Sequence, residues 1–398
     1  MQRKQAFKKA LKSVLILSAA LVSAILAIAL SLGPTWVAKR FNPVIHSTPA
    51  TLTPAAQTLH QSLTVVDLHA DSLLWGRDLS KRSDAGHVDI PRLQQGNVAL
   101  QIFAAVTKVP SPLLLEGNTA DSDDIIKLAL LQRWPMATWF SLQKRARYQA
   151  KRLKRLARQR PNDFRVIETQ QDLSEHLAQQ QTGQPVTAGL LAVEGAHVLE
   201  HQLSNINRLY DAGFRIVGLS HFFDNAVAGS AHGVSQGGLT PFGQQAIQQI
   251  ESLHMLIDLA HASPQTIDDV LQIATQPVLV SHTGVRGTCE TTRNLTDSQL
   301  RQIANNGGVV GIGFWRTAVC GEDIDAIVRA IRYAADHIGV AHVALGSDFD
   351  GAVRAPFDVS QLGQLTQDLQ RNGFTDTEIQ KIMGLNVVNL LQQYLPPT

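Results

Sequence analysis

The chain has 398 residues and a formal net charge of only +2, which argues against a dedicated nucleic-acid binder. Hydrophobic residues make up 44% of the chain, so a large core is possible, and the length suits a single large α/β barrel. The only two cysteines, Cys289 and Cys320, exclude a disulfide-framework protein and a four-cysteine zinc site. Several of the fourteen histidines follow apolar runs, and functional residues are therefore sought at those positions.

The N-terminus predicts attachment to a membrane. Residues 1–12 carry five basic side chains and no acidic one, and residues 13–33 form a run of apolar and small residues. About 20 such residues span a bilayer core as a helix. We expect a basic cytoplasmic tail over 1–12 and an uncleaved transmembrane signal anchor over 13–33, with a cleaved signal peptide as the alternative. The positive-inside rule then places the large domain outside the cytoplasm, in the periplasm if the cell is bacterial.

The rest of the chain is expected to be a linker over 34–60 and one domain over 61–398. Pro, Thr and Ser are frequent in the linker, and eight strand-like apolar runs follow it. Helix-start patterns such as Ser263-Pro264 and Thr296-Asp297 lie between most of these runs. This alternation predicts an α/β fold, a (β/α)8 TIM barrel, although a doubly wound sheet would alternate in the same way. The runs are Thr64–His69, Val98–Val106, Ala188–Glu194, Ile216–Ser220, Met255–Leu259, Val278–Ser281, Gly308–Phe314 and Val343–Gly346.

One long segment, 108–161, interrupts the alternation and is predicted to be a helical insertion. Its second half, 144–160, is strongly basic and has few apolar residues. It has two interpretations. It is either an amphipathic helix that rests on anionic lipid beside the anchor, or a solvated helix face without a partner.

The stretch Val65–Asp71 has the pattern of a buried strand that ends in two metal-capable side chains. Residues two apart in a strand share a face, so His69 and Asp71 can reach one point together. An imidazole nitrogen and a carboxylate oxygen suit a divalent metal such as zinc. Taken alone, the pair His69 and Asp71 would also be explained by a half-buried structural histidine followed by a helix-capping aspartate. The argument therefore depends on whether other strands end in matching groups.

Five other predicted strands also end in metal-capable side chains. In a parallel barrel all strand C-termini open on one face, so these groups are expected to meet there. A single His at such a position is usually structural and a single Asp is commonly a helix cap, but six coincidences are much less probable than one. The residues are His69 with Asp71, then Glu194, His221, His261, His282 and Asp348.

This set of groups predicts a site for two metal ions. Two metals need a bridging carboxylate and further ligands on each side. His69 and Asp71 can serve one metal, and Glu194 can bridge it to a second. His261 and His282 can bind the second metal. His221 and Asp348 then remain for acid–base catalysis or for stabilising an oxyanion. The spacing alone does not say which carboxylate bridges.

From about residue 64 to residue 391 the chain resembles the membrane (renal-type) dipeptidases, metallopeptidases of the amidohydrolase superfamily. The order and spacing of the motifs carry the resemblance more than any one motif does. The motif Lys381–Asn386 resembles the C-terminal helix pattern of that family. The other matching stretches are Asp67–Asp71, His87–Leu93, Val193–Gly195, Leu219–His221, Ile257–Ser263, Ser281–His282, Arg293–Asn294 and Gly346–Gly351.

The resemblance implies hydrolysis of small dipeptides by a hydroxide that bridges two Zn²⁺ ions, and it implies a possible homodimer. His221 would contact the substrate near the oxyanion, Asp348 would be the acid–base group, and Arg293 would hold the substrate's terminal carboxylate. The insertion and the loop 222–238, which is rich in Gly, Ala and Ser, depart from the family pattern and leave the substrate preference open. The implied metal ligands are His69 and Asp71 on the first zinc, Glu194 as the bridge, and His261 and His282 on the second.

Two other functions and one structural question stay open. Another binuclear amidohydrolase could act on a cyclic amide, lactone, phosphoester or β-lactam. Many such enzymes bridge their metals with a carboxylated lysine, but the only lysine near a strand end is Lys108. A membrane-anchored binding protein on a barrel scaffold would have lost ligands, and none is missing. Cys289 and Cys320 follow the sixth and seventh strands and either pair in an oxidising compartment or remain free thiols.

Overall fold

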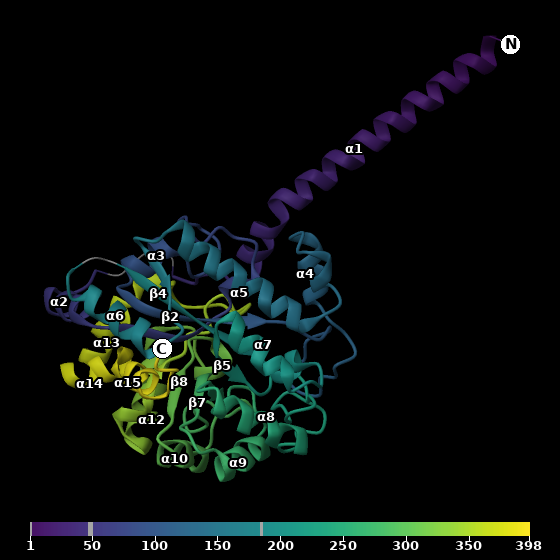
Figure 1. Cartoon of the computed structure of the whole chain (residues 1–398). Coiled ribbons are helices and arrows are strands. Elements are labelled where there is room, and N and C mark those ends of the chain that lie inside the picture. Colours follow the sequence, from purple (N-terminus) through teal and green to yellow (C-terminus); the bar gives the residue numbers. More distant parts are fainter. Residues whose placement is uncertain (1, 47–50, 184–185) are drawn as a thin grey trace.

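A computed structural model describes residues 2–46, 51–183 and 186–398 of the chain. Within these residues, nine parallel strands form one sheet that helices surround (Figure 1). The strands are β1 (Val65–Ala70), β2 (Val98–Val106), β3 (Phe164–Val166), β4 (Thr187–Glu194), β5 (Phe214–Gly218), β6 (Leu256–Asp258), β7 (Leu279–Thr283), β8 (Val309–Ile312) and β9 (Val343–Leu345).

Eight of these strands form a closed barrel, which confirms the predicted TIM-barrel fold. β2 pairs with β1 on one edge and with β4 on the other, from Leu100 opposite Ala188 to Val106 opposite Glu194. This second pairing closes the ring. The short strand β3 pairs only with the first residues of β4. It was not predicted because its three residues contain no apolar run.

The helices begin where side-chain caps satisfy the free backbone N–H groups of the first turn. As predicted, Ser263 caps α9 and Thr296 caps α10, each by accepting a hydrogen bond from a backbone N–H three residues later. The helices are α1 (Gln2–Phe41), α2 (Pro54–Ser62), α3 (Ile90–Gln95), α4 (Ile125–Leu131), α5 (Leu142–Gln159), α6 (Gln170–Gln180), α7 (Ser204–Ala212), α8 (Pro241–Ser252), α9 (Pro264–Ile273), α10 (Asp297–Asn305), α11 (Arg316–Val319), α12 (Ile324–Ile338), α13 (Gly363–Arg371), α14 (Asp376–Gln380) and α15 (Asn386–Tyr394).

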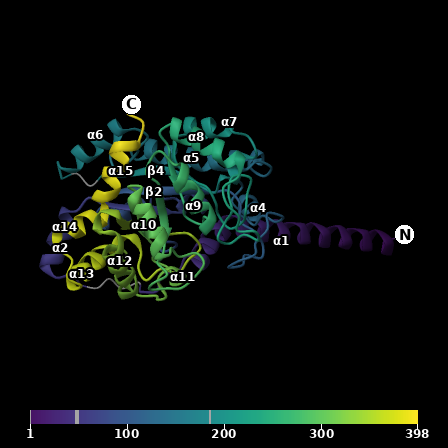
Figure 2. The same cartoon turned by 90° about the horizontal axis from the view of Figure 1, so that it is seen from below.

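The first helix, α1, projects away from the rest of the chain (Figures 1 and 2). Residues 13–33 lie within it, and the side chains at positions 25, 26, 28 and 29 lie outside the described residues. Over the described part of the chain, no helix is both long and apolar enough for a membrane crossing, so the predicted transmembrane helix is not supported. The segment predicted as a linker, 34–60, holds the end of α1 and most of α2, and its residues 47–50 also lie outside the described residues.

The insertion 108–161 contains α4 and α5, and β3 follows just after it. The basic stretch 144–160 lies almost entirely in α5. Two of its arginines turn inward. Arg145 donates to the carbonyl oxygens of Thr107 and Thr138, and Arg152 donates to those of Leu73 and Trp75. Part of the basic character therefore serves to bind the domain's own backbone, while the opposite face carries exposed cations at positions 144, 147, 151, 155 and 158.

Burial along β4 explains why Glu194 points into the barrel. Leu191 and Val193 belong to the same buried cluster as Leu153 of α5, which covers the outside of the strand. Leu190 belongs to a second buried cluster, which contains alternate strand residues such as Ala192 together with residues of α6 and α15. Because residues two apart in a strand share a face, Glu194 shares the inward face with Leu190.

The motif Lys381–Asn386 joins the C-terminal helices to the barrel. A Cβ atom on Gly384 would lie 1.9 Å from the carbonyl oxygen of Thr64, so only glycine permits this approach to the start of β1. The Asn386 amide donates to the carbonyl oxygens of Val340 and Val343, at 2.7 and 2.8 Å. The motif is thus structural and fixes the strands that carry the site.

Candidate metal centre

The predicted ligands converge on the carboxylate of Glu194 at the C-terminal ends of the strands. Oε1 of Glu194 lies 3.1 Å from Nε2 of His261 and 3.5 Å from Nε2 of His69. The same oxygen lies 3.5 Å from Nε2 of His282. Oε2 lies 3.2 Å from Nε2 of His221. Five side chains from β1, β4, β7 and the segments after β5 and β6 therefore meet at one point, and all are buried.

Asp71 and Asp348 extend this cluster on the His69 side. Oδ1 of Asp71 lies 3.3 Å from Nε2 of His69, and ligand atoms of all three residues lie within 4.8 Å of one another. Two further groups satisfy the same criterion, and both contain Glu194: one with His69 and His282, the other with His221 and His261. All seven residues predicted as metal ligands or as acid–base groups thus lie together. Which role each takes stays a prediction.

The orphaned atoms of the cluster fit a metal centre. Nε2 of His69, Oδ1 of Asp71 and Oε2 of Glu194 are buried without a hydrogen-bond partner. Buried polar atoms are normally paired, so several orphans aimed at one place indicate a missing ligand. In addition, Nε2 of His261 and Nε2 of His282 lie 2.9 Å apart. Imidazole nitrogens with carboxylate oxygens are a donor set that zinc accepts.

The charges of the site give the same indication. Burial raises the pKa of Asp71, Glu194 and Asp348 well above the ordinary carboxyl range, and carboxyl groups in this cluster raise one another further. Burial likewise lowers the pKa of His261 and His282 well below the usual value, which keeps both imidazoles neutral, as metal binding requires. Three clustered carboxyl groups beside neutral imidazoles need a cation to ionise together.

A layer of polar residues behind the ligands fixes the direction of the imidazole rings. The Ser281 hydroxyl lies 3.2 Å from Nδ1 of His69 and 2.9 Å from Nδ1 of His282. It can donate to one ring and accept from the other, which leaves both Nε2 atoms facing the centre. Asp67 acts next to it: its carboxylate accepts from the backbone N–H and hydroxyl of Ser347, and that hydroxyl also bonds the His69 carbonyl. Asp67 thus supports the backbone that carries His69.

We expect Ser281→Ala to weaken metal binding about tenfold or more, because residues that orient metal ligands are typically worth about 10–100-fold in affinity. The rings of His69 and His282 would lose the partner that they share. Titration of the metal-free protein against a competing chelator measures this. The exposed Ser252→Ala change on α8 is the control. Equal affinity in both variants would contradict the role of Ser281.

A cavity of about 380 Å³ opens beside the cluster and is large enough for a small substrate. Glu194, His221, His261 and Asp348 line one side of it, and apolar side chains line much of the rest. Arg293 also lines this cavity and is 8% exposed. The structure therefore places all eight predicted site residues in or around one chamber.

The guanidinium of Arg293 is held from behind and keeps a free donor. Nη2 donates to the His282 carbonyl at 2.6 Å and Nη1 to the Thr283 hydroxyl at 3.2 Å, while Nε is buried without a partner. Burial lowers the pKa of Arg293 to about 10, so the group stays charged at neutral pH. A fixed, desolvated cation with an unused N–H is suited to an anionic group of a ligand.

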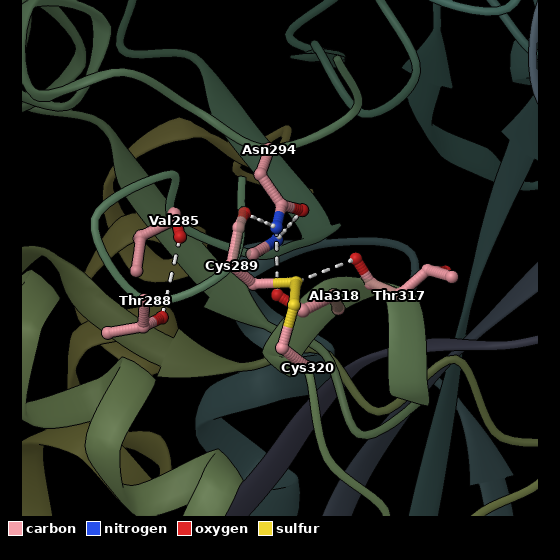
Figure 3. Close-up of a disulfide and its surroundings, with 8 residues drawn as sticks. Val285, Thr288, Cys289, Asn294, Thr317, Ala318 and Cys320 are labelled. Atoms are coloured by element: carbon pink, nitrogen blue, oxygen red, sulfur yellow. Dashed lines mark hydrogen bonds between the residues drawn. A yellow bond between two sulfur atoms is a disulfide. The ribbon is translucent and has the colours of Figure 1, made fainter. Parts of the chain in front are cut away.

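The disulfide Cys289–Cys320 braces the loop that carries Arg293 (Figure 3). It joins this loop to the end of α11. The amide of Asn294, next to Arg293, donates to the carbonyl oxygens of Cys289 and Ala318 at 2.7 and 2.9 Å. The structure therefore pairs the two cysteines, one of the two alternatives that the sequence left open.

The sequence missed His232, which also lines the cavity. Its ring lies 5.1 Å from the rings of Phe222 and His261, and its Nδ1 donates to the Leu115 carbonyl at 2.7 Å. Burial lowers the pKa of His232 to about 4, so the ring is neutral at neutral pH. The only sequence signal for His232 was its place in the Gly-rich loop 222–238. It does not follow a predicted strand, so the search at strand ends did not find it.

The Lys108 ammonium group is directed away from the metal cluster, while the backbone of Lys108 lies beside the His221 ring. Its ammonium group donates to the Ala120 carbonyl at 2.5 Å and lies 5.5 Å from the ring centre of Phe223. It does not line the cavity that holds Glu194. This position gives no support to a bridging carboxylated lysine.

Comparisons with a family model and with known proteins all indicate the same family. A family model described as membrane dipeptidase (peptidase family M19) matches residues 54–394. Dipeptidase ataJ of Aspergillus terreus is 30% identical over 338 residues, which are 77% of this chain and 77% of that protein. An uncharacterized dipeptidase of Schizosaccharomyces pombe is 29% identical over 319 residues, 76% of this chain and 71% of that protein.

Solved structures share the fold. One is a metallo peptidase from Rhodobacter sphaeroides, solved with a phosphinate mimic of the dipeptide L-Ala-D-Ala. It superposes with a TM-score of 0.70 at 24% identity and covers 83% of this chain and 99% of that one. The probable dipeptidase PvdM of Pseudomonas aeruginosa gives a TM-score of 0.71 at 19% identity, with coverages of 86% and 98%.

Proposed function

Because the chain belongs to the membrane dipeptidase family and is a metallo-dipeptidase, we propose that it hydrolyses dipeptides with two zinc ions held around Glu194. The observation that carries this proposal is the convergence of four imidazole Nε2 atoms on the Glu194 carboxylate, at the wall of a cavity that also holds Arg293. His69 and Asp71 would hold one ion, His261 and His282 the other, and Glu194 would bridge them. When bound, the ions would supply Lewis acidity that activates water for attack at neutral pH and polarises the substrate carbonyl.

The protein's own residues would divide the remaining work. Asp348 would take the proton of the attacking water and pass it to the leaving amine nitrogen, a task that a carboxyl group of raised pKa suits. His221, with its buried neutral ring against Glu194, would donate a hydrogen bond to the developing oxyanion. Arg293 would hold the terminal carboxylate and so limit substrates to short peptides that end at this point.

A metal-removal experiment tests the proposal. We expect the full chain to contain two zinc ions and to hydrolyse a panel of dipeptides that includes L,D pairs. Chelator treatment should abolish hydrolysis, and zinc should restore it. A protein without metal and without activity would favour the binding-scaffold alternative. Turnover of a cyclic amide, lactone or β-lactam without dipeptide hydrolysis would favour another amidohydrolase.

Arg293→Ala is expected to raise the KM for dipeptides about 10–100-fold, because a hydrogen bond to a charged group is worth about 1.5–3 kcal/mol. The same dipeptides with an amidated C-terminus are the matched control, since they lack the carboxylate that Arg293 would hold. Their KM should change much less. An equal effect on both substrate sets, measured by steady-state kinetics, would contradict the assignment.

We propose further that α1 anchors the chain at a membrane, with the catalytic domain outside the cytoplasm. Support comes from the basic residues 1–12, from exposed apolar side chains on α1 such as Leu15 and Leu17, and from the pairing of Cys289 with Cys320, which suits an oxidising compartment. Fractionation of cells that express the full chain should place it in carbonate-washed membranes, accessible to external protease. Recovery in the soluble fraction would contradict the proposal. The homodimer implied by the resemblance stays a prediction that sedimentation velocity tests.

A further inference from the structure

Three consecutive leucines form an exposed apolar wall of the cavity. Leu113, Leu114 and Leu115 (the leucine segment) are 49%, 50% and 55% exposed, and all three line the chamber that contains His221 and Arg293. Exposed apolar side chains that gather beside polar groups at a cavity mark a ligand-binding surface. An apolar group of a ligand would cover them.

The leucine segment is held in place by two residues. The Asn118 amide accepts from the Leu114 N–H and donates to the Leu114 carbonyl, both at 2.9 Å. The Asn118 backbone N–H in turn donates to the His232 carbonyl at 2.9 Å, and the His232 ring donates to the Leu115 carbonyl. The leucines are therefore presented to the cavity by a network of hydrogen bonds from two different loops.

A third contact places the leucine segment at the Arg293 end of the cavity. The Thr292 hydroxyl donates to Oε1 of Glu116 at 2.8 Å, and Glu116 directly follows the leucine segment. Thr292 precedes Arg293, and Thr291 lines the same cavity. The apolar wall therefore lies close to the loop that carries Arg293, and both line the same cavity.

We propose that the leucine segment forms the pocket for the side chain of the substrate's C-terminal residue, and that this chain selects dipeptides with a bulky apolar residue at that position. The inference rests on the proposed dipeptidase function and on the role of Arg293 within it. Each methylene buried against such a wall is worth about fourfold in affinity. Because the wall is open on one side, a C-terminal leucine should be favoured over alanine by about tenfold.

The test compares kcat/KM for Ala-Leu and Ala-Ala in the zinc-loaded full chain and in a triple variant, Leu113→Ser, Leu114→Ser and Leu115→Ser. The exposed positions make the changes compatible with folding, which thermal melting checks. The control is Leu130→Ser, an equally exposed leucine of α4 that does not line the cavity. We expect a ratio of about ten in the wild type and the control, and a ratio near one in the triple variant.

A wild-type ratio near one, or a ratio near ten retained in the triple variant, would overturn the inference while leaving the dipeptidase proposal intact. If no dipeptide is hydrolysed, the proposed dipeptidase function is wrong, but the pocket can still be tested. In that case calorimetry with phosphinate pseudo-dipeptides that end in leucine or alanine decides the matter. Tighter binding of the leucine compound, lost in the triple variant, would still support the pocket. Equal binding, or none, would overturn it as well.

Discussion

Glu194→Gln is expected to lower kcat/KM for dipeptides by about a thousandfold or more, corresponding to about 4 kcal/mol of transition-state stabilisation. The substitution keeps the shape of the side chain and removes the charge that four imidazole nitrogens surround. Elemental analysis of the purified variant should show the loss of at least one of the two metal ions. Glu175→Gln, an exposed change on α6, is the control and should leave both quantities unchanged.

The thermal stability of the metal-free proteins shows whether Glu194→Gln loses activity and metal because it unfolds or because the carboxylate ligand is gone. Burial raises the pKa of Glu194 in the folded state, so its stabilising contribution is complete only below the ordinary carboxyl pKa and is lost as the pH rises. Above the ordinary carboxyl pKa the unfolded chain ionises this group more readily than the folded chain does, which opposes folding, whereas the neutral glutamine has no such cost. Metal-free Glu194→Gln should consequently melt no lower than the metal-free wild type. Full metal content with full activity would refute the bridging role.

Asp348→Asn is expected to lower kcat by about a thousandfold through a different cause, because general acid–base catalysis contributes about 10²–10⁴-fold. Asparagine fills the same space and cannot accept the proton of the attacking water. KM should change little, since the ligand cluster and Arg293 are left intact. Steady-state kinetics across a dipeptide panel measure both quantities.

The metal content of this second variant decides what Asp348 does. Two bound ions with the low kcat would support a proton-transfer role. Loss of an ion would make Asp348 a ligand, which its position within 4.8 Å of the His69 and Asp71 ligand atoms also allows. Unchanged kcat with two ions would contradict both roles. Asp336→Asn, an exposed change on α12, is the matched control.

Asp348 and His261 have an unusual backbone conformation. Their φ angles are 58° and 61°, in the left-handed region that residues with a Cβ adopt at a cost of about 1–3 kcal/mol. Each lies three residues past the end of a barrel strand, and both side chains line the cavity. No sequence pattern announced either conformation, because neither residue is the glycine that such a turn favours.

The eight barrel strands and the candidate ligands could be found from sequence because both depend on near neighbours along the chain. Apolar runs of strand length, Ser and Thr caps, and metal-capable residues directly after a run are local patterns, and the runs coincide with the barrel strands to within a few residues. The short strand β3, the cavity residue His232 and the leucine segment carry no such pattern. Their positions depend on contacts with distant loops, so local patterns could not reveal them.

By itself, the sequence determined the alternation of strands and helices that is typical of a barrel, the strand ends and the list of groups able to hold metal, because these depend on side-chain periodicity along the chain. Only the tertiary structure decided how those groups meet. The pairing of β2 with β4 closes the ring, within which side chains from residue 69 to residue 348 gather around Glu194. In the folded chain Ser281 lies between the rings of His69 and His282, and the leucine segment lies close to the loop that carries Arg293. Distances between such remote residues arise from packing, which no single stretch of the chain contains.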